Sequence, residues 1–376
     1  MSLHPQSSIP HPRRILVRGV NWLGDAVMTT PALLRLREKF PGAHIALLTP
    51  EKLHAFWQHH PAVDEAIPFA ADESVFSVAK KLRQHGFSLA LVLPNSPRSA
   101  LEVFLAGIPQ RLGYARPWRN FFLTQAIASR PGAVKMRKRT PLEIRQLVAG
   151  EKIGNRKSEI GNRLAHQLHE YLHLAAALGA NPEPLAPQLF VTPEEIAATK
   201  IKFGLEQMAA PVFGLNPGAE YGSAKRWPVE KFIAAAKEIQ QRTNCAWILF
   251  GGKNDVVTTA QIESAIGNPQ SAIFNLAGQT SLRELMALLK LCRVVLTNDT
   301  GPMHVAAALG TPVVVPFGST SPELTGPGLP GDPRHRLLKS DAPCAPCFLR
   351  ECPINFRCLN GISVERVVAA VLESKL

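Results

Sequence analysis

Residues 14–40 read RILVRGVNWLGDAVMTTPALLRLREKF and decide the fold class. A short apolar run over residues 14–20 leads into a turn with two glycines, and an amphipathic helical pattern follows over residues 26–40. Apolar runs that alternate with helical patterns are typical of βαβ units and parallel sheets. This stretch therefore predicts an α/β protein.

The same alternation continues almost to the end of the chain. In the first half we expect a helix over residues 74–85 and further strands over residues 44–48, 65–69 and 89–94. A second series of strands is expected over residues 212–216, 245–250, 273–276, 294–298 and 313–317. The architecture thus occurs twice, which predicts two doubly wound sheets.

A proline-rich stretch separates the two series. Residues 179–187 read GANPEPLAP, and this proline density suits a linker. A chain of 376 residues also exceeds the usual size of a single core. We therefore predict a first domain over residues 1–184, a second domain over residues 185–362, and a C-terminal helix over residues 363–376 that packs at the domain junction.

Composition narrows the location and the partners. The chain has no apolar run long enough to span a bilayer and begins without a secretory signal pattern, so we expect a cytoplasmic protein. Lysine and arginine outnumber aspartate and glutamate by 42 to 29, which favours an anionic partner. Residues 133–163 hold nine basic and three acidic side chains, either as a solvated face or as a surface for the acceptor or a membrane.

The first motif, GVNWLGDAVMTTP over residues 19–31, follows the first expected strand. The carboxyl end of such a strand is where ligands bind in doubly wound sheets. The glycine spacing lacks the Lys-Ser/Thr of a Walker loop and does not match the dinucleotide pattern, so nucleotide binding here is disfavoured. Taken alone, Asp25 is more simply explained as a helix cap that favours the helix dipole than as a catalytic residue.

The second motif, NPGAEYGSAKRWP over residues 216–228, leaves the first strand of the second series. Its small residues let backbone N–H groups approach an anion, and Lys225 would hold a diphosphate. A glycine turn with a solvated Lys-Arg pair is the alternative.

The third motif, TNDTGPMHVAAALGTP over residues 297–312, follows a strand and enters a helix. Asp299 or Thr300 is expected to cap that helix, whose first N–H groups form an anion site. His304 lies one turn further, where packing and a functional role are both open.

Four cysteines, Cys344, Cys347, Cys352 and Cys358, have the spacing C-x2-C-x4-C-x5-C. Such a cluster could hold a tetrahedral zinc ion, although the spacing is tighter than in zinc ribbons or fingers. Disulfides are disfavoured in a reducing cytoplasm, so free buried thiols are preferred.

The three motifs, in this order and at these strand ends, resemble the ADP-heptose:lipopolysaccharide heptosyltransferases of glycosyltransferase family 9. The resemblance implies a GT-B fold, in which two Rossmann-like domains have parallel sheets that face a central crevice. Residues 93–96, LPNS, and residues 106–113, AGIPQRLG, look most similar to the heptosyltransferase II branch, which adds the second core heptose.

The resemblance also implies roles for individual residues. Asp25 would be the general base that takes a proton from the acceptor hydroxyl during an inverting displacement. Lys225 would be the second catalytic residue, since it neutralises the departing diphosphate. Thr280 matches the position where the family's backbone holds adenine. The full donor set is Gly218, Ala219, Lys225, Thr280, Asp299, Thr300, Gly301 and His304. The acceptor set is Gly24, Asn95 and Ser96.

The implied partners are an ADP-heptose donor and a lipid A–Kdo/heptose acceptor, without nucleic acid, metal or cofactor. We expect a monomer that contacts the cytoplasmic face of the inner membrane peripherally. Two alternatives stay open at this point. One is a sugar-nucleotide epimerase with the same twin-Rossmann architecture, and the other is a basic nucleic-acid-binding protein, although no motif for nucleic-acid binding is present.

Overall fold

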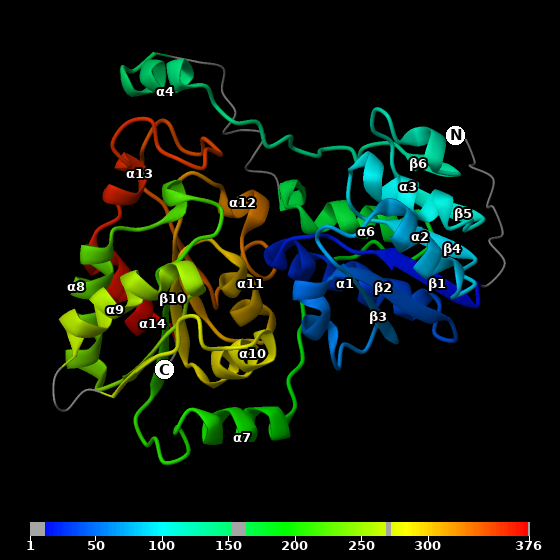
Figure 1. The fold of residues 1–376 in the computed structure, drawn as a ribbon. Coiled ribbons are helices and arrows are strands. Elements are labelled where there is room, and N and C mark those ends of the chain that lie inside the picture. Colours follow the sequence, from blue (N-terminus) through cyan, green and yellow to red (C-terminus); the bar gives the residue numbers. More distant parts are fainter. Residues whose placement is uncertain (1–11, 152–162, 268–271, 375–376) are drawn as a thin grey trace. The chain divides into compact units, whose positions relative to one another are not determined.

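The computed structural model describes residues 12–151, 163–267 and 272–374 (Figure 1). It divides into one unit of Met1–Ala133 with Leu168–Leu185 and a second unit of Val134–Gln167 with Ala186–Leu376. The first unit thus ends inside the predicted linker, whereas Val134–Gln167 groups with the second unit although it precedes the linker. Part of the predicted basic stretch, residues 152–162, lies outside the described residues.

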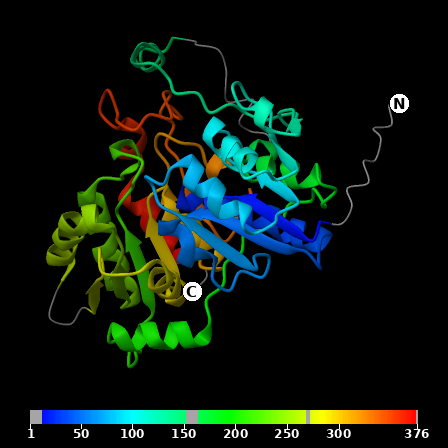
Figure 2. The ribbon, with the colours of Figure 1, turned by 45° about the vertical axis from the view of Figure 1, so that its right-hand side comes forward.

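The first unit contains one parallel sheet, whose strands run from blue to cyan in Figure 2. Among its described residues the strand order is β3-β2-β1-β4-β5-β6, the order of a Rossmann domain. The strands are β1 (Arg14–Arg18), β2 (His44–Pro50), β3 (Glu65–Phe69), β4 (Leu89–Val92), β5 (Gln110–Tyr114) and β6 (Gln125–Ile127).

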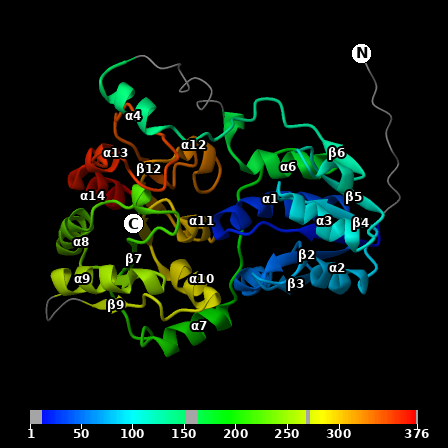
Figure 3. The ribbon, with the colours of Figure 1, turned by 45° about the horizontal axis from the view of Figure 1, so that its top comes forward.

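Helices cover both faces of this sheet (Figure 3). Apolar side chains of α2 (Val75–Arg83) and α3 (Pro97–Leu105) share a core with one face. Helix α1 (Leu23–Lys39) pairs with α6 (Leu168–Ala176). Because both faces are covered, the central strands are mainly apolar, and Ile15, Leu16 and Val17 of β1 are fully buried.

The second unit repeats this plan with other residues. Its strand order, β12-β11-β10-β7-β8-β9, is the same as that of the first sheet when strands are counted from β7. The strands are β7 (Val212–Asn216), β8 (Ala246–Leu249), β9 (Ile273–Asn275), β10 (Val294–Thr297), β11 (Val313–Pro316) and β12 (Arg336–Leu338). The prediction of two doubly wound parallel sheets is confirmed.

Eight helices accompany the second sheet in the part of the unit described after residue 185. They are α7 (Pro193–Lys202), α8 (Val229–Thr243), α9 (Val256–Ile266), α10 (Leu282–Leu291), α11 (Gly301–Ala308), α12 (Pro322–Thr325), α13 (Arg357–Asn360) and α14 (Val364–Glu373). The segment before the linker adds α4 (Pro141–Val148). Helix α14 packs on α8 and beside β11 and β12, with Val367, Val368 and Val371 in the core.

Three strands were not predicted from the sequence: β5, β6 and β12. Strand β5 reads QRLGY, and its arginine and glycine hide the apolar pattern of a buried strand. Strands β6 and β12 have three residues each and lie at the sheet edges, where one neighbouring strand suffices. None of the described helices is both long enough and apolar enough to cross a membrane.

Candidate active site

Strand order locates a binding edge in each unit. In a doubly wound sheet the connections diverge after two adjacent central strands, and ligands bind at the carboxyl ends of that pair. The pair is β1 and β4 in the first unit and β7 and β10 in the second. All three sequence motifs follow one of these strands.

Asp25 follows β1 and lies in the first turn of α1. The cap position of this helix is occupied by Trp22, so Asp25 is the third helical residue rather than the N-cap. A carboxylate here still interacts favourably with the helix dipole. Asp25 is half-buried, as is the preceding Gly24 of the predicted acceptor set.

A buried ion pair supports this edge of the first sheet. Arg18 Nε donates to Glu102 Oε2 over 2.9 Å, and the two side chains are 3% and 0% exposed. Arg18 also donates to the carbonyl oxygen of Gly19 and to Asn21 Oδ1, at 2.7 and 3.0 Å. The pair ties the end of β1 to α3 and fixes the turn that leads to Asp25. Sequence analysis missed it because its two residues are 84 positions apart.

Asn95 and Ser96 follow β4, next to the end of β1. Ser96 is the N-cap of α3 and accepts from the backbone N–H of Ser99 at 3.3 Å. Asn95 Oδ1 accepts from Arg119 Nη1 at 3.4 Å, and the same nitrogen donates to the carbonyl oxygen of Pro94 at 2.8 Å. Both predicted acceptor residues are exposed, so they combine a structural contact with access to a ligand.

Lys225 and Asp299 form the centre of the second edge. Lys225 Nζ lies 2.7 Å from Asp299 Oδ2, with the side chains 14% and 4% exposed. Thr320 Oγ1 donates to the same carboxylate oxygen. The ammonium group also lies 5.0 Å from the ring centroid of Tyr221. The structure therefore brings together two predicted donor residues from separate motifs.

Two buried asparagines hold the loop that carries Lys225. The side chain of Asn298 accepts from the backbone N–H of Trp227 at 3.0 Å and donates to the carbonyl oxygen of Pro217 at 2.7 Å. Asn216 Nδ2 donates to Thr297 Oγ1 at 3.0 Å. These hydrogen bonds attach both ends of the loop to the end of β10. They restrict the path of the loop between these two attachment points.

Gly218 and Ala219 lie beside a carboxylate that the sequence analysis did not identify. A Cβ atom on Gly218 would come within 2.3 Å of Asp255 Oδ2, so the carboxylate occupies the space that a side chain would need. Asp255 Oδ1 lies 3.3 Å from Arg226 Nη2, which also donates to the carbonyl oxygen of Ala219. Gly252 N–H donates to Asp255 Oδ2 at 3.0 Å. Asp255, which follows β8, therefore holds a carboxylate against this loop.

The third motif starts α11. Thr300 occupies the N-cap position, but its side chain makes no cap hydrogen bond within the described part of the chain. Gly301 is the first residue of the helix. Burial lowers the pKa of His304 to about 4; the charge of Asp299 opposes this shift, and Lys225 and His166 add to it. His304 is therefore a buried neutral imidazole at neutral pH.

Thr280 lies apart from these residues. It follows β9, the edge strand, and directly precedes Ser281, the N-cap of α10. Two strand positions separate β9 from β7, with β8 between them. The second edge therefore extends from the Lys225–Asp299 pair through Asp255 to Thr280.

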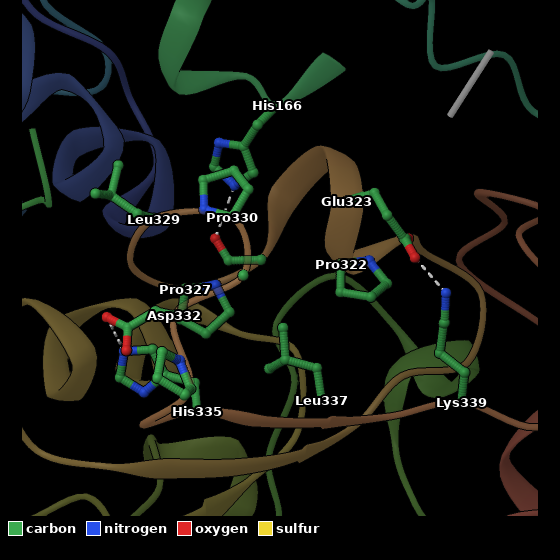
Figure 4. A pocket seen from close by; sticks show the side chains of 13 residues that line it. His166, Pro322, Glu323, Pro327, Leu329, Pro330, Asp332, His335, Leu337 and Lys339 are labelled. Carbon is green, nitrogen blue, oxygen red and sulfur yellow. Dashed lines mark hydrogen bonds and ion pairs between the residues drawn. The ribbon is translucent and has the colours of Figure 1, made fainter. Parts of the chain in front are cut away.

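A cavity of about 460 Å³ opens elsewhere in the second unit (Figure 4). His166 Nε2 at its rim donates to the carbonyl oxygen of Gly326, 2.9 Å away. Burial lowers the pKa of His335 to about 4, and among the described residues neither of its ring nitrogens has a hydrogen-bond partner. None of the predicted site residues lines this cavity.

The six cysteines all fall within the described residues and are free thiols. Cys344, Cys347 and Cys358 are buried, and burial raises the pKa of each thiol. No group of three or more His, Cys, Asp or Glu side chains among the described residues is arranged to hold a metal ion. The arrangement does not support the zinc alternative.

Comparison with known proteins bears on this site. The profile of glycosyltransferase family 9 (heptosyltransferase) matches residues 75–356. Lipopolysaccharide heptosyltransferase 2 of Escherichia coli (strain K12) is 33% identical over 322 residues, which cover 84% of this chain and 85% of that protein. Lipooligosaccharide heptosyltransferase 2 of Haemophilus ducreyi (strain 35000HP) is 31% identical over 331 residues, covering 84% and 86% of the two chains.

The solved structure of E. coli ADP-heptose lps heptosyltransferase II superposes with a TM-score of 0.75 at 29% sequence identity, covering 96% of this chain and 97% of that one. This likeness confirms the predicted GT-B fold class and the resemblance to the heptosyltransferase II branch. The family match also favours a glycosyltransferase over the epimerase and nucleic-acid-binding alternatives. The chain therefore belongs to glycosyltransferase family 9, the heptosyltransferases.

Proposed function

We propose that this glycosyltransferase moves heptose from ADP-L-glycero-D-manno-heptose to the Kdo/heptose inner core of lipopolysaccharide, with inversion at the anomeric carbon. The observation that carries the proposal is the division of charge between two equivalent sheet edges. A carboxylate, Asp25, follows β1, and a cation, Lys225, follows β7. A displacement by a sugar hydroxyl needs a base on the acceptor and positive charge on the departing diphosphate.

The diphosphate of the donor would bind at the Lys225–Asp299 pair. An ammonium group has three donors, so Lys225 can keep its 2.7 Å contact with Asp299 and still donate to a phosphate oxygen. Backbone N–H groups of Thr300 and Gly301 at the start of α11 would add further donors. Lys225 and this helix start supply the positive charge, so the proposal invokes no metal and no cofactor.

The nucleoside would extend from the diphosphate across β8 towards β9. In dinucleotide-binding domains an acid after the second strand holds the ribose hydroxyls. Asp255 follows β8, the second strand of this sheet, and its carboxylate lies beside Gly218. Ribose on Asp255 would direct adenine towards the backbone at Thr280. The loop at Gly218 and Ala219 would then lie against the bridge between ribose and phosphate.

Asp25 would act as the general base on the acceptor. The acceptor hydroxyl forms the new bond to the anomeric carbon of heptose, the bond to ADP breaks, and the hydroxyl proton passes to the Asp25 carboxylate. Gly24, Asn95 and Ser96 would contact the acceptor sugar at the same edge. His304 would assist at the donor as a neutral hydrogen-bonding group, because its pKa is lowered to about 4.

The acceptor is a lipid, and this fixes where the enzyme would work. We propose a cytoplasmic monomer that contacts the cytoplasmic face of the inner membrane peripherally. The net charge of +13 supports contact with the anionic headgroups of that face. The phosphates and carboxylates of the acceptor would be attracted in the same way.

A thermal-shift panel with ADP, ADP-heptose, UDP, GDP and NAD tests the donor. A ligand at about 100 times its Kd stabilises the folded protein by about 2.7 kcal/mol. We expect selective stabilisation by ADP and ADP-heptose, followed by heptose transfer to a Kdo-containing acceptor in a product assay. Preference for UDP or GDP would replace the proposed donor. Release of a modified sugar nucleotide without any acceptor would instead indicate an epimerase.

A further inference from the structure

We propose that the first unit carries a membrane-docking surface for anionic phospholipid, formed by Phe104, Trp118 and Phe121 with Arg83, Arg111 and Arg116. This aromatic–basic surface lies on β5, on the connection between β5 and β6, and on the ends of α2 and α3. This inference rests on the proposed function, because an enzyme with a lipid acceptor has to act at a bilayer. The exposed aromatic side chains and the charges of the surface support it separately.

Two large aromatic side chains on this surface point into solvent. Trp118 is 90% exposed and Phe121 is 81% exposed, the first and third most exposed of the large hydrophobic side chains described. Both lie in one short connection that includes the 3-10 turn Asn120–Phe122. Exposed tryptophan and phenylalanine so close together are unusual on a soluble surface, and tryptophan prefers the interface between lipid and water.

The aromatic side chains extend over the neighbouring helix. The ring of Phe121 lies 5.9 Å from that of Phe104 on α3 and 5.7 Å from that of Phe122. Phe104 and Phe122 are 5.4 Å apart. Phe121 is therefore the outer member of an aromatic cluster that joins the β5–β6 connection to α3, rather than an isolated side chain.

The connection is held rigidly from beneath. Arg119, between the two exposed aromatics, is fully buried and donates to the carbonyl oxygen of Pro94 at 2.8 Å. Arg111 Nε donates to the carbonyl oxygen of Phe122 at 2.8 Å, and Asn120 Oδ1 accepts from the backbone N–H of Arg116 at 2.8 Å. Trp118 has φ of +63°, a left-handed conformation that is uncommon for a bulky residue. An anchored loop loses little conformational entropy when its aromatics enter a bilayer.

Positive charge surrounds the aromatics. Arg111 Cζ lies 5.3 Å from the ring centroid of Phe104. Arg83 Nη2 donates to the carbonyl oxygen of Leu105 at 2.7 Å, which places a second guanidinium beside the end of α3. Arg116 lies two residues before Trp118.

Negative charge is missing from the same part of the sequence. Between Glu102 and Ala133, where this part of the first unit ends, the chain has four arginines and no acidic residue. Glu102 itself is buried and paired with Arg18 and Arg98. Arg130 pairs with Glu170, and Arg119 is buried. Arg83, Arg111 and Arg116 remain as the basic side chains of the surface, which matches an anionic headgroup layer.

This chemistry fits a bilayer better than RNA or a protein groove. Single-stranded RNA binds in a basic groove whose aromatics stack on successive bases. Trp118 and Phe121 instead project at 90% and 81% exposure from a short turn. Two projecting aromatics with arginines on neighbouring elements are the pattern of interfacial anchors, in which rings enter the headgroup boundary and cations bind phosphate.

Vesicle co-sedimentation of the full-length protein tests the surface. The protein should bind vesicles of phosphatidylglycerol and phosphatidylethanolamine and bind vesicles of phosphatidylcholine far less. The double variant Trp118→Ala/Phe121→Ala should lose about tenfold or more of this binding. Arg83→Gln should lose about fivefold, and added salt should weaken binding of the wild type.

Matched controls separate docking from folding. Ile201 and Val257 are 65% and 82% exposed in the second unit, so Ile201→Ala/Val257→Ala removes comparable apolar surface elsewhere. That variant should bind vesicles like the wild type, and both double variants should melt at the wild-type temperature. Equal vesicle binding by all three proteins, or no binding by the wild type, overturns the inference.

Tryptophan fluorescence reports on the position of Trp118. Trp57, Trp227 and Trp247 are buried, and Trp22 is 52% exposed, so Trp118 dominates any change at the surface. Anionic vesicles should shift the emission to the blue, and lipids brominated near the headgroup should quench it. Trp118→Phe should keep most of the vesicle binding and lose this signal. A blue shift that persists in Trp118→Phe contradicts the proposed insertion.

The surface and the proposed reaction fail separately. On a deacylated, water-soluble acceptor, Trp118→Ala/Phe121→Ala should turn over like the wild type, whereas on acceptor embedded in vesicles its rate should fall about tenfold. Vesicle binding that depends on Trp118 and Phe121, without transfer to any acceptor, upholds the surface and removes the reaction. Transfer to an acceptor without vesicle binding upholds the reaction and removes the surface. Tight binding of single-stranded RNA that requires both aromatics would replace the membrane as the partner.

Discussion

In the first sheet, strand β1 is followed by a half-buried carboxylate, Asp25. In the second sheet, strand β7 is followed by a loop that presents a cation, Lys225. The two sheets have the same strand order, so the position of each edge comes from topology. The chemistry at each edge comes from the turn. A short turn into α1 gives a single acid at a helix start, while a longer glycine loop gives a cation paired with Asp299.

The support beneath the two edges differs as well. Under the first edge, Arg18 and Glu102 form a buried ion pair, whereas Asn95 and Ser96 are exposed. In the second, the ion pair of Lys225 and Asp299 is itself part of the candidate site. Substitutions at the first edge should therefore lower turnover without lowering stability. Substitutions at the second edge should lower both.

The largest effect is expected from Lys225→Met. Loss of the positive charge on the diphosphate should lower turnover by about 10²- to 10³-fold. Because Asp299 is then left buried without its cation, the free energy of unfolding should fall by about 3 kcal/mol. Steady-state kinetics and urea unfolding measure the two effects.

Lys202→Met is the matched control, because Lys202 forms an exposed pair with Glu284. It should change stability by less than about 1 kcal/mol and leave turnover unchanged. If Lys225→Met retains more than a tenth of the wild-type turnover, the difference in charge between the two edges is not the basis of the reaction.

Asp25→Asn should lower turnover by about 10²-fold or more, as expected for loss of a general base. Asparagine has the same shape and keeps the helix start, so stability and affinity for ADP-heptose should stay close to those of the wild type. Kinetics on the acceptor together with calorimetric titration of the donor separate these quantities. Glu38 forms an exposed pair with Arg35, so Glu38→Gln is the matched control. It should change neither turnover nor the affinity for ADP-heptose. Equal turnover in both variants would exclude Asp25 as the base.

Gly218→Ala tests the close approach of loop and carboxylate in the second edge. The new Cβ atom would lie 2.3 Å from Asp255 Oδ2, so the carboxylate must move away from Arg226 and Gly252. Affinity for ADP should fall by about tenfold, the equivalent of about 1.4 kcal/mol. Gly42→Ala in the first unit has nothing within 4 Å of its new Cβ atom and should leave ADP binding unchanged. An unchanged affinity in Gly218→Ala would show that Asp255 does not contact the nucleotide.

Local sequence was sufficient for the central strands and for the motifs that follow them. The middle of a run such as Arg14–Arg18 is apolar because both faces of the sheet are covered, and a turn directly after such a run has to lie at the binding edge. Strand β5 was missed because its sequence, QRLGY, is recognised as a strand only through its neighbours β4 and β6.

The missed parts of the site are contacts between distant segments. Arg18 pairs with Glu102 across 84 positions, and Thr320 reaches Asp299 across 21. Asp255 was overlooked although it stands only three residues after Gly252, because its importance comes from its approach to Gly218 in another loop. Patterns of spacing report which elements form, but not which side chains of different elements meet.

The last prediction concerns acid stability, with one histidine in each unit. Burial lowers the pKa of His335 in the second unit and of His60 in the first to about 4, from 6.5 in the unfolded chain. The unfolded chain therefore binds more protons between pH 6.5 and 4, and stability falls as the pH drops through this window. From pH 7 to pH 5 each histidine should cost about 2 kcal/mol. His335→Gln and His60→Gln should each reduce the acid loss by this amount, measured by urea unfolding at the two pH values. Equal acid loss in wild type and His335→Gln would show that His335 is protonated in the folded second unit. The same result for His60→Gln would show it for the first, so the two variants assign acid sensitivity to each unit separately.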